Sequence, residues 1–299
     1  MPIPWNLFGW HDLPNEVEAC LARLPMPYLS GNDFDIRGSG EGKVVLLHRF
    51  VEQIIGEFPI HKQAIGDCVS HGWGLCTDVL ACVDIAVRKE AEEWKAEAAT
   101  EAIYGGSRVE IGGGRLGNSD GSTGAWAAEF VSKYGILARL AYGSVDLTSY
   151  SGQRAKDWGR RGVPDDLEPV AREHPVKTTS LVTTYEEARD AIANGYPVAV
   201  CSMQGFSDRR DGEGFARPQG SWAHCMSFIA VDDQHSRPGL LCMNSWGPSW
   251  ISGPKRHDQP EGSFWVDAVT CTSMLRGRDS FALSGFVGYP RRELDYILV

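Results

Sequence analysis

The sequence predicts an α+β fold in which a helical half precedes a β-rich half. Two stretches near the start, residues 44–58 and 68–102, have the apolar spacing of helices and contain no internal proline. Beyond Gly195, short runs of apolar and β-branched residues are typical of buried strands. The predicted strands are residues 197–202, 226–231, 240–244 and 263–266.

The segments between these elements also have recognisable patterns. Pro59 ends the first helix, and residues 105–124 contain eight glycines, which predicts a loop. A further helical stretch covers residues 125–134, and Gly135 is a suitable C-cap. Residues 143–180 are polar and irregular, and we expect them to cross between two lobes. Residues 185–193 predict one more short helix.

Composition excludes several classes of function. The chain has 299 residues, 42% of them hydrophobic, and a net charge of −10, with basic residues gathered only in pairs. This pattern argues against nucleic acid as a partner. We expect no membrane span, because no apolar run approaches the roughly 18 residues that a span needs. We also expect no secretory signal, because the N-terminus has no basic start followed by an apolar run.

The cysteines point to a reducing compartment. There are eight, and no two are spaced as CxxC, so neither a zinc site nor a redox motif is predicted. A chain of this length without an export signal is expected to keep its thiols reduced. We therefore predict a cytoplasmic protein without metal or cofactor.

A candidate nucleophile, Cys68, follows Asp67 near the start of the second helix. Asp67 is a good N-cap, so Cys68 would lie in the first helical turn, where unpaired N–H groups favour a thiolate. Five residues earlier, Gln63 could donate its side-chain N–H to an oxyanion.

A cysteine nucleophile needs a base, and the base needs a partner that orients it. His224 precedes an apolar run, and Asn244 ends another run and is followed by Ser-Trp-Gly. His71, three residues after Cys68, is a nearer histidine. Helical geometry places it along the helix from the thiol, so we interpret it as a packing or surface residue.

The order Gln63, Cys68, His224 and Asn244, with Ser-Trp-Gly after the asparagine, resembles the papain-like cysteine peptidases. The resemblance implies a two-lobe fold, with a helical lobe, a β-barrel-like lobe and the active site in the cleft between them. It also implies that Cys68 attacks, His224 acts as the base, Asn244 orients His224, and Gln63 completes the oxyanion hole.

Further residues fit the same resemblance. Gly121, Ser122, Thr123 and Gly124 correspond to a substrate ledge, Trp246 to a wall over the histidine, and Trp222 to the pocket for the substrate's second side chain. The implied division of the chain is an extension (1–60), a helical lobe (61–160), a β-rich lobe (161–290) and a tail (291–299).

The chain departs from the family pattern at several points. The Gln63-to-Cys68 spacing is one residue short, Val69 replaces an aromatic residue, and Ile65 replaces a cysteine that bleomycin-hydrolase-type relatives also lack. The 60-residue leader is short for an inhibitory propeptide, which argues against zymogen control.

The expected function is hydrolysis of peptide bonds through a thioester acyl-enzyme, with a peptide or protein as substrate. Two alternatives remain open at this point. One is a papain-like scaffold with a structural or binding role in a larger assembly, such as a virus particle. The other is a different thiol-dependent acyl transfer, of the amidase or transglutaminase type.

Overall fold

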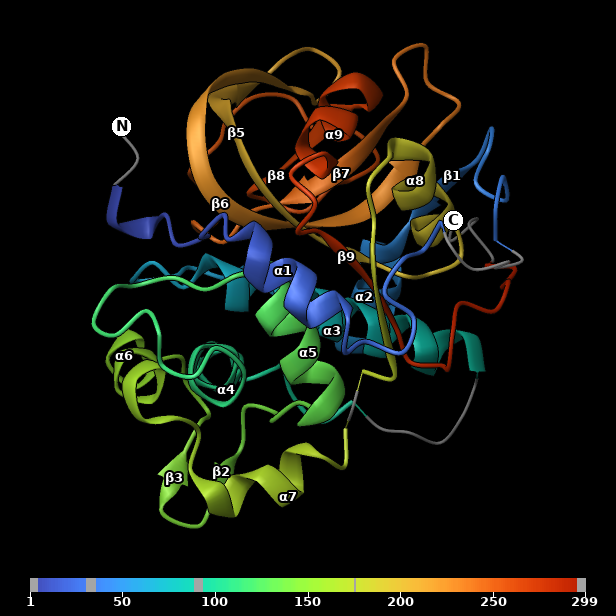
Figure 1. The fold of residues 1–299 in the computed structure, drawn as a ribbon. Coiled ribbons are helices and arrows are strands. Elements are labelled where there is room, and N and C mark those ends of the chain that lie inside the picture. Colours follow the sequence, from blue (N-terminus) through green and yellow to red (C-terminus); the bar gives the residue numbers. More distant parts are fainter. Residues whose placement is uncertain (1–4, 31–35, 89–93, 175, 295–299) are drawn as a thin grey trace.

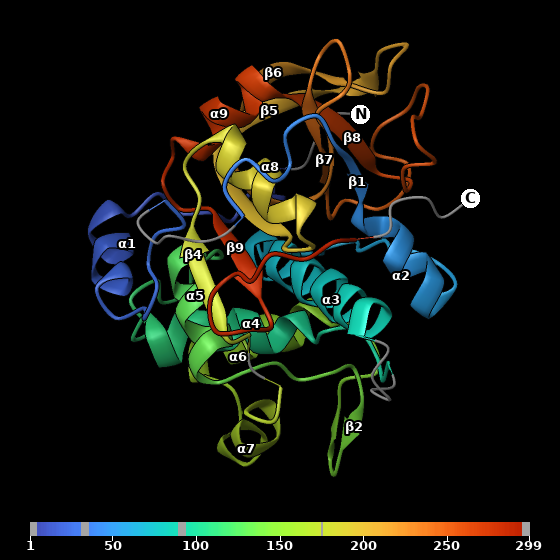
Figure 2. The same ribbon diagram turned by 90° about the vertical axis from the view of Figure 1, so that its right-hand side faces the viewer.

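The computed structural model describes residues 5–30, 36–88, 94–174 and 176–294 (Figure 1). The long helix α3 (Cys68–Arg88) runs through the centre of the molecule. A β-sheet lies on one side of α3, and most of the shorter helices lie on the other side (Figures 1 and 2). The predicted α+β class is confirmed.

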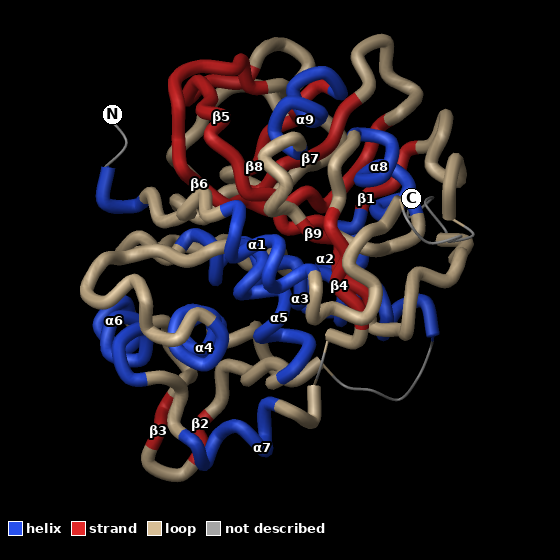
Figure 3. Tube along the Cα trace, in the orientation of Figure 1, coloured by secondary structure: helices blue, strands red, loops and turns tan. Residues whose placement is uncertain are grey.

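The helices come mainly from the first two thirds of the chain (Figure 3). Besides α3 they are α1 (Pro14–Leu21), α2 (Leu47–Ile55), α4 (Thr100–Gly106), α5 (Gly124–Lys133), α6 (Gly152–Arg161), α7 (Glu168–Ala171), α8 (Tyr185–Ala193) and α9 (Ala268–Leu275). Short turns of helix occur at η1 (Trp5–Leu7), η2 (Ser107–Ile111) and η3 (Asp165–Leu167).

The main sheet has seven antiparallel strands in the order β4-β9-β5-β6-β7-β8, and β1 pairs with β6 beside this path. Its strands are β1 (Val44–Leu46), β4 (Thr178–Leu181), β5 (Val198–Arg210), β6 (Ala216–Asp232), β7 (Gly239–Met243), β8 (Ser263–Asp267) and β9 (Phe281–Ser284). A small hairpin joins β2 (Ala141–Tyr142) to β3 (Val145–Asp146). Among the described residues the sheet ends at β4 and β8 and does not close, so the expected barrel is not found.

Glycine allows α3 to lie directly on the sheet. A Cβ atom on Gly72 would come within 2.9 Å of the Cys225 sulfur, and the Gly72 carbonyl accepts a hydrogen bond from the Ser227 hydroxyl at 2.9 Å. Cys68 lies one helical turn before Gly72, so the same face of α3 carries the predicted nucleophile to β6.

The sequence patterns predicted the position of most elements better than their length. The helix expected at residues 44–58 begins as strand β1, because its first three residues pair with β6. Helix α3 ends well before residue 102, and Gly105 and Gly106 belong to α4. A Cβ on Gly106 would lie 1.9 Å from the Phe130 ring, so this glycine allows close packing and does not mark a loop.

The N-terminal residues pack onto the rest of the fold. Helix α1 lies against α5, where the Arg23 guanidinium pairs with the Glu129 carboxylate at 2.6 Å. The described helices include none that is long and apolar enough to cross a membrane.

Candidate active site

Cys68 is fully buried at the first residue of α3. The Asp67 carbonyl accepts from His71 N–H at 3.2 Å, as an N-cap residue should, but its carboxylate accepts from the Tyr150 hydroxyl at 2.8 Å. The expected capping by the Asp67 side chain is therefore wrong. The backbone N–H groups of Cys225 and Gly9 lie near enough to the Cys68 sulfur to lower the pKa of its thiol, against the larger effect of burial. These contacts place the thiol beside the residue that follows His224.

His224 in β6 and Asn244, directly after β7, form a pair. The distance between His224 Nε2 and Asn244 Oδ1 is 2.8 Å, and Ser245 N–H donates to the same oxygen at 2.7 Å. Because Oδ1 is thereby the acceptor, Nε2 carries the histidine proton and Nδ1 is left with its lone pair. His224 Nδ1 is buried and has no hydrogen-bond partner within the described part of the chain. The Trp246 ring lies 4.6 Å from the His224 ring, centroid to centroid, and covers it.

Both polar atoms of the Gln63 side-chain amide form hydrogen bonds at this site. Its Oε1 accepts from the Ser245 hydroxyl at 2.6 Å, and its Nε2 donates to Ile65 O at 2.8 Å and to Leu7 O at 2.9 Å. The side chain expected to bind an oxyanion thus already binds a carbonyl oxygen of the chain's own N-terminal region.

Residues 7–11, here called the covering segment, lie across this site. Ser122 N–H donates to Gly9 O at 2.8 Å, and His11 N–H donates to Ser122 O at 2.9 Å. On the opposite side, Trp10 N–H donates to Ala223 O at 3.1 Å, next to His224. The segment is therefore held by main-chain hydrogen bonds to the expected ledge and to β6.

Gly9 lies beside the thiol, and only glycine fits there. A Cβ atom at this position would be 1.8 Å from Gly66 O. The backbone N–H of Gly9 is near enough to the Cys68 sulfur to lower the pKa of its thiol.

The two tryptophans at the site have different surroundings. Trp222 is 6% exposed and packs against Phe8 and Trp246, with ring centroids 6.4 Å and 4.8 Å away. Trp10 is 4% exposed, and its indole N–H donates to the Asp279 carboxylate at 2.7 Å. Trp222 thus belongs to an aromatic cluster, and Trp10 belongs to the buried core.

Burial keeps both reactive groups uncharged in this form. It raises the pKa of the Cys68 thiol well above the ordinary value, and the nearby Cys225 raises that pKa further. Burial also lowers the pKa of His224 to about 4, against the opposing effect of the hydrogen bond to Asn244. A neutral thiol and a neutral imidazole therefore coexist at neutral pH.

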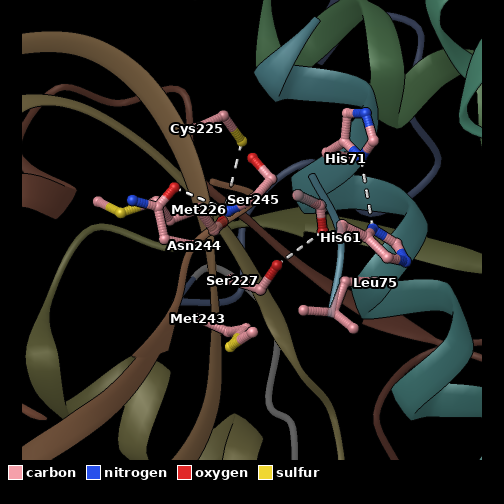
Figure 4. Close-up of a pocket in the computed structure, with 10 residues that line it drawn as sticks. His61, His71, Leu75, Cys225, Met226, Ser227, Met243, Asn244 and Ser245 are labelled. Atoms are coloured by element: carbon pink, nitrogen blue, oxygen red, sulfur yellow. Dashed lines mark hydrogen bonds between the residues drawn. The ribbon is translucent and has the colours of Figure 1, made fainter. Parts of the chain in front are cut away.

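Behind these residues is a cavity of about 10 Å³ between α3 and strands β6 and β7, enough for about one water molecule (Figure 4). His61 and His71 line its helical side, and Asn244 and Ser245 line its sheet side. His71 contacts His61 at 3.4 Å, Nδ1 to Nδ1, and its Nε2 lies 3.5 Å from Asp67 Oδ2. His71 is buried and contacts His61 and Asp67.

His61, Asp78 and Glu97 are the described residues that could hold a cation, with one donor atom from each within 4.8 Å of the others. Nitrogen and carboxylate donors of this kind suit zinc. His61 Nε2 is 3.3 Å from Glu97 Oε2, and the Glu97 side chain is 37% exposed. Asp78 Oδ2 and His61 Nε2 are buried and have no hydrogen-bond partner among the described residues.

No family model and no curated protein matches the sequence. Among solved structures, xylellain, a cysteine protease from Xylella fastidiosa, superposes with a TM-score of 0.54 at 15% identity, over 93% of this chain and 91% of that one. The fold is papain-like. The proform of Amb a 11, a ragweed pollen cysteine protease, gives a TM-score of 0.53 at 13% identity, over 93% and 74% of the two chains. Procathepsin L 3 of Tenebrio molitor gives 0.50 at 13% identity, over 90% and 79%.

The papain-like fold places all the predicted site residues in one region, where Gln63, Cys68, His224 and Asn244 share neighbours. The sequence interpretation missed the covering segment and Asp279. The Phe-Gly-Trp run at residues 8–10 was a weak signal for the segment, since a glycine between two aromatic residues permits close backbone approach. Asp279 has no local pattern that distinguishes it.

Proposed function

We propose that this papain-like protein is a cysteine peptidase that hydrolyses peptide bonds through a thioester acyl-enzyme. The observation that carries the proposal is the covering segment. An extended peptide lies beside Cys68 and is bonded through its main chain to Ser122 on one side and Ala223 on the other. A site that holds its own chain in this way suits a peptide substrate, because main-chain hydrogen bonds do not depend on sequence.

In the proposed reaction, His224 Nδ1 takes the proton of the Cys68 thiol, and the sulfur attacks the carbonyl carbon of the substrate. Gln63 Nε2 donates to the oxygen that becomes negative. The C–N bond breaks, His224 returns the proton to the leaving amine, and a thioester remains on Cys68. Water then attacks the thioester and gives its proton to His224, and that proton passes to the sulfur as the acid product leaves.

Asn244 and Trp246 support this role of His224. The hydrogen bond from Nε2 to Asn244 Oδ1 fixes the tautomer in which Nδ1 is the base. Trp246 covers the ring and keeps water from this hydrogen bond. The scheme uses no metal or cofactor.

The described arrangement corresponds to a closed form of the proposed enzyme. The covering segment occupies the donor of Gln63 and the space in front of the Cys68 sulfur. It would have to leave before a substrate binds. Its release would admit water and would allow the thiol and the imidazole to form an ion pair.

Two other functions would use the same fold differently. A binding scaffold in a larger assembly would not need a reactive thiol. A thiol-dependent acyl transferase or amidase would use the thiol on other bonds. The cytoplasmic location and the peptide or protein partner remain predictions from the sequence.

Chemical labelling followed by a substrate panel tests the proposal. The full chain carrying Gly9→Ala is treated with iodoacetamide, and each of the eight cysteines is followed by mass spectrometry; all are buried and unpaired in the closed form. Cys68 should react at least about tenfold faster than the other seven, since only it gains a base and access. The same protein should cleave peptides. A double variant that also carries Cys68→Ala should not cleave them, and its melting temperature should be nearly unchanged.

Uniformly slow labelling without turnover would contradict the proposal and favour a scaffold. Fast labelling of Cys68 with turnover of simple amides or transfer to amines, but no peptide hydrolysis, would favour the other acyl-transfer chemistry. Peptide cleavage that survives Cys68→Ala would reject this nucleophile.

A further inference from the structure

The side chains of His61, Asp78 and Glu97 come together from three separate segments of the chain. Asp78 belongs to α3, His61 lies before that helix, and Glu97 lies before α4. One donor atom from each residue lies within 4.8 Å of the others. His61 Nε2 and Glu97 Oε2 are 3.3 Å apart, about the separation of two ligands that lie ~2.0 Å from a tetrahedral zinc ion. Only small movements are therefore needed for all three to bind one ion.

Two of these side chains have buried polar atoms that lack a partner. Asp78 is 3% exposed, and its Oδ1 accepts from Ala98 N–H at 2.8 Å. Its Oδ2 and His61 Nε2 have no hydrogen-bond partner within the described ranges. Buried polar atoms are rarely left unsatisfied, because they have lost their hydration. A ligand that satisfies both atoms would remove this cost.

The neighbours of His61 determine which of its ring nitrogens carries the proton. Its Nδ1 lies 3.4 Å from His71 Nδ1, and His71 Nε2 lies 3.5 Å from the Asp67 carboxylate (Figure 4). A carboxylate accepts, so His71 carries its proton on Nε2, and its Nδ1 accepts from the Nδ1–H of His61. His61 Nε2 then has a free lone pair. Histidines that bind metal ions typically donate their other ring N–H in this way.

A lone pair opposite two carboxylates requires a positive charge between them, which a second proton on His61 or a metal ion could supply. One proton on Nε2 would serve the contact with Glu97 and would leave Asp78 Oδ2 without a partner. A metal ion would be bound by all three groups at once. Water would supply a hydrogen bond but not the charge.

Arg139 does not satisfy the buried carboxylate oxygen. Its guanidinium is close enough to act electrostatically on Asp78 and Glu97. Its two terminal nitrogens, however, donate to Glu101 Oε2 and to Thr100 Oγ1, each at 3.0 Å. Asp78 Oδ2 is therefore still available as a ligand.

We propose that His61, Asp78 and Glu97 form a binding site for a divalent transition-metal ion such as zinc. The imidazole nitrogen favours zinc over calcium and magnesium, which prefer oxygen ligands alone. Because the Glu97 side chain is 37% exposed, solvent can supply a fourth ligand. The sequence gave no indication of this site, since its three ligands are distant from one another along the chain.

The ion would connect two parts of the candidate active site. Asp78 belongs to the helix that begins with Cys68, and His61 lies two residues before Gln63. His61 O accepts from Gly247 N–H at 3.0 Å, so this segment is also bonded to the residues after Asn244. The expected effect of the ion is on the stability of this arrangement and not on the chemical step. The inference therefore does not depend on the peptidase function.

The test begins with the full chain after dialysis against EDTA and then against metal-free buffer. Zinc chloride titrated in a calorimeter should bind at one ion per chain, with a dissociation constant on the order of 10 µM or tighter. The melting temperature should rise by about 4 °C at a zinc concentration a hundredfold above that constant. Calcium chloride at the same concentration should leave the melting temperature unchanged.

Three variants identify the ligands. His61→Ala, Asp78→Asn and Glu97→Gln should each weaken zinc binding by about a hundredfold or more. Asp78→Asn keeps an acceptor for Ala98 N–H, so the loss would not come from a broken helix contact. His174→Gln is the matched control, because it removes an exposed histidine that could bind zinc adventitiously, and it should leave the affinity unchanged.

Crystals of the parent chain grown with zinc give an answer that needs no variant to fold. X-ray data collected at the zinc absorption edge should show an anomalous peak about 2.0–2.2 Å from His61 Nε2 and from both carboxylates.

Several results would overturn the proposal. The absence of both a calorimetric signal and an anomalous peak would mean that a protonated His61 simply pairs with Glu97. Zinc binding that persists in all three variants, or that is lost in His174→Gln, would place the ion elsewhere. Equal binding of calcium would reject a transition-metal site. None of these results bears on peptide cleavage, so this inference and the proposed function can fail separately.

Discussion

The side-chain nitrogen of Gln63 donates to the carbonyl oxygen of Leu7 at 2.9 Å, across 56 positions of sequence. A group that the proposed mechanism reserves for a substrate oxygen is thereby occupied by the protein itself. Together with the Gly9 backbone beside the Cys68 sulfur, this contact occupies the candidate site in the described form.

Gly9→Ala should open the site. The added methyl group would overlap Gly66 O, which is 1.8 Å from its position, and the three nearest atoms are all backbone atoms of Gly66, which cannot move aside as a side chain could. The rate of Cys68 alkylation should rise about tenfold or more over the unmodified chain. Gly212→Ala is the control, since nothing lies within 4 Å of a Cβ at that glycine. Equal labelling rates in the two variants would mean that the segment does not limit access.

Three histidine and asparagine variants, made in the open Gly9→Ala protein, test the proposed base. His224→Ala should lower kcat by about a thousandfold or more, and Asn244→Ala by about ten- to a hundredfold. Removal of the partner that orients the base reduces kcat less than removal of the base itself. His71→Ala should keep most activity, since His71 contacts His61 and Asp67. A dead His71→Ala beside an active His224→Ala would transfer the role of base to His71.

Trp222→Ala should mainly destabilise the protein. Trp222 is 6% exposed within an aromatic cluster that includes Phe8, Phe206 and Trp246, so its removal leaves a large cavity. We expect a loss of about 3 kcal/mol in the free energy of unfolding, measured in urea. Trp5→Ala, at a position 83% exposed, should change it little. An unaltered stability combined with a changed peptide profile would instead restore Trp222 as a pocket wall.

His48 should make the protein less stable in acid. Burial lowers its folded-state pKa to about 4, so the unfolded chain takes up a proton first as the pH falls below about 6.5. Stability should fall from pH 7 to pH 4.5, with His48 responsible for on the order of 2 kcal/mol.

Comparison of unfolding free energies at the two pH values measures this contribution. The drop should be smaller in His48→Gln than in the parent chain, and His174→Gln, at an exposed residue, should leave it unchanged. The same drop in all three proteins would show that His48 is already hydrated in the folded state.

Local patterns in the sequence were sufficient to predict where several helices and strands lie. Helix α8 follows a Thr184 cap and appears at the predicted residues. Each of the four predicted strands lies within an observed strand or extends one residue past one of its ends. Their full length could not be predicted, because β5 and β6 extend by pairing with each other through polar, partly exposed residues. The first three residues of the helix predicted at 44–58 form strand β1 for the same reason, because they pair with β6, which is distant in sequence.

The same distinction applies to the candidate site. Residues in informative local patterns could be predicted from the sequence, and residues whose partners are remote in sequence could not. Cys68, His224 and Asn244 could be selected because their residue types and neighbours are informative, and the fold brings their segments together. The pair Trp10–Asp279 joins residues 269 positions apart, and neither has a neighbouring motif. Capping of α3 was mispredicted since Tyr150, also remote in sequence, competes for the Asp67 carboxylate.

The contact between Gly9 and Cys68 has a further consequence for storage of the protein. Peroxide oxidises thiolates far faster than thiols, and it has to reach the sulfur to do so. In the closed form the sulfur is inaccessible and protonated, so an oxidative burst should spare it. A molecule whose covering segment has left would lose this protection at the moment it becomes reactive, and its working lifetime would then depend on the redox state of its surroundings.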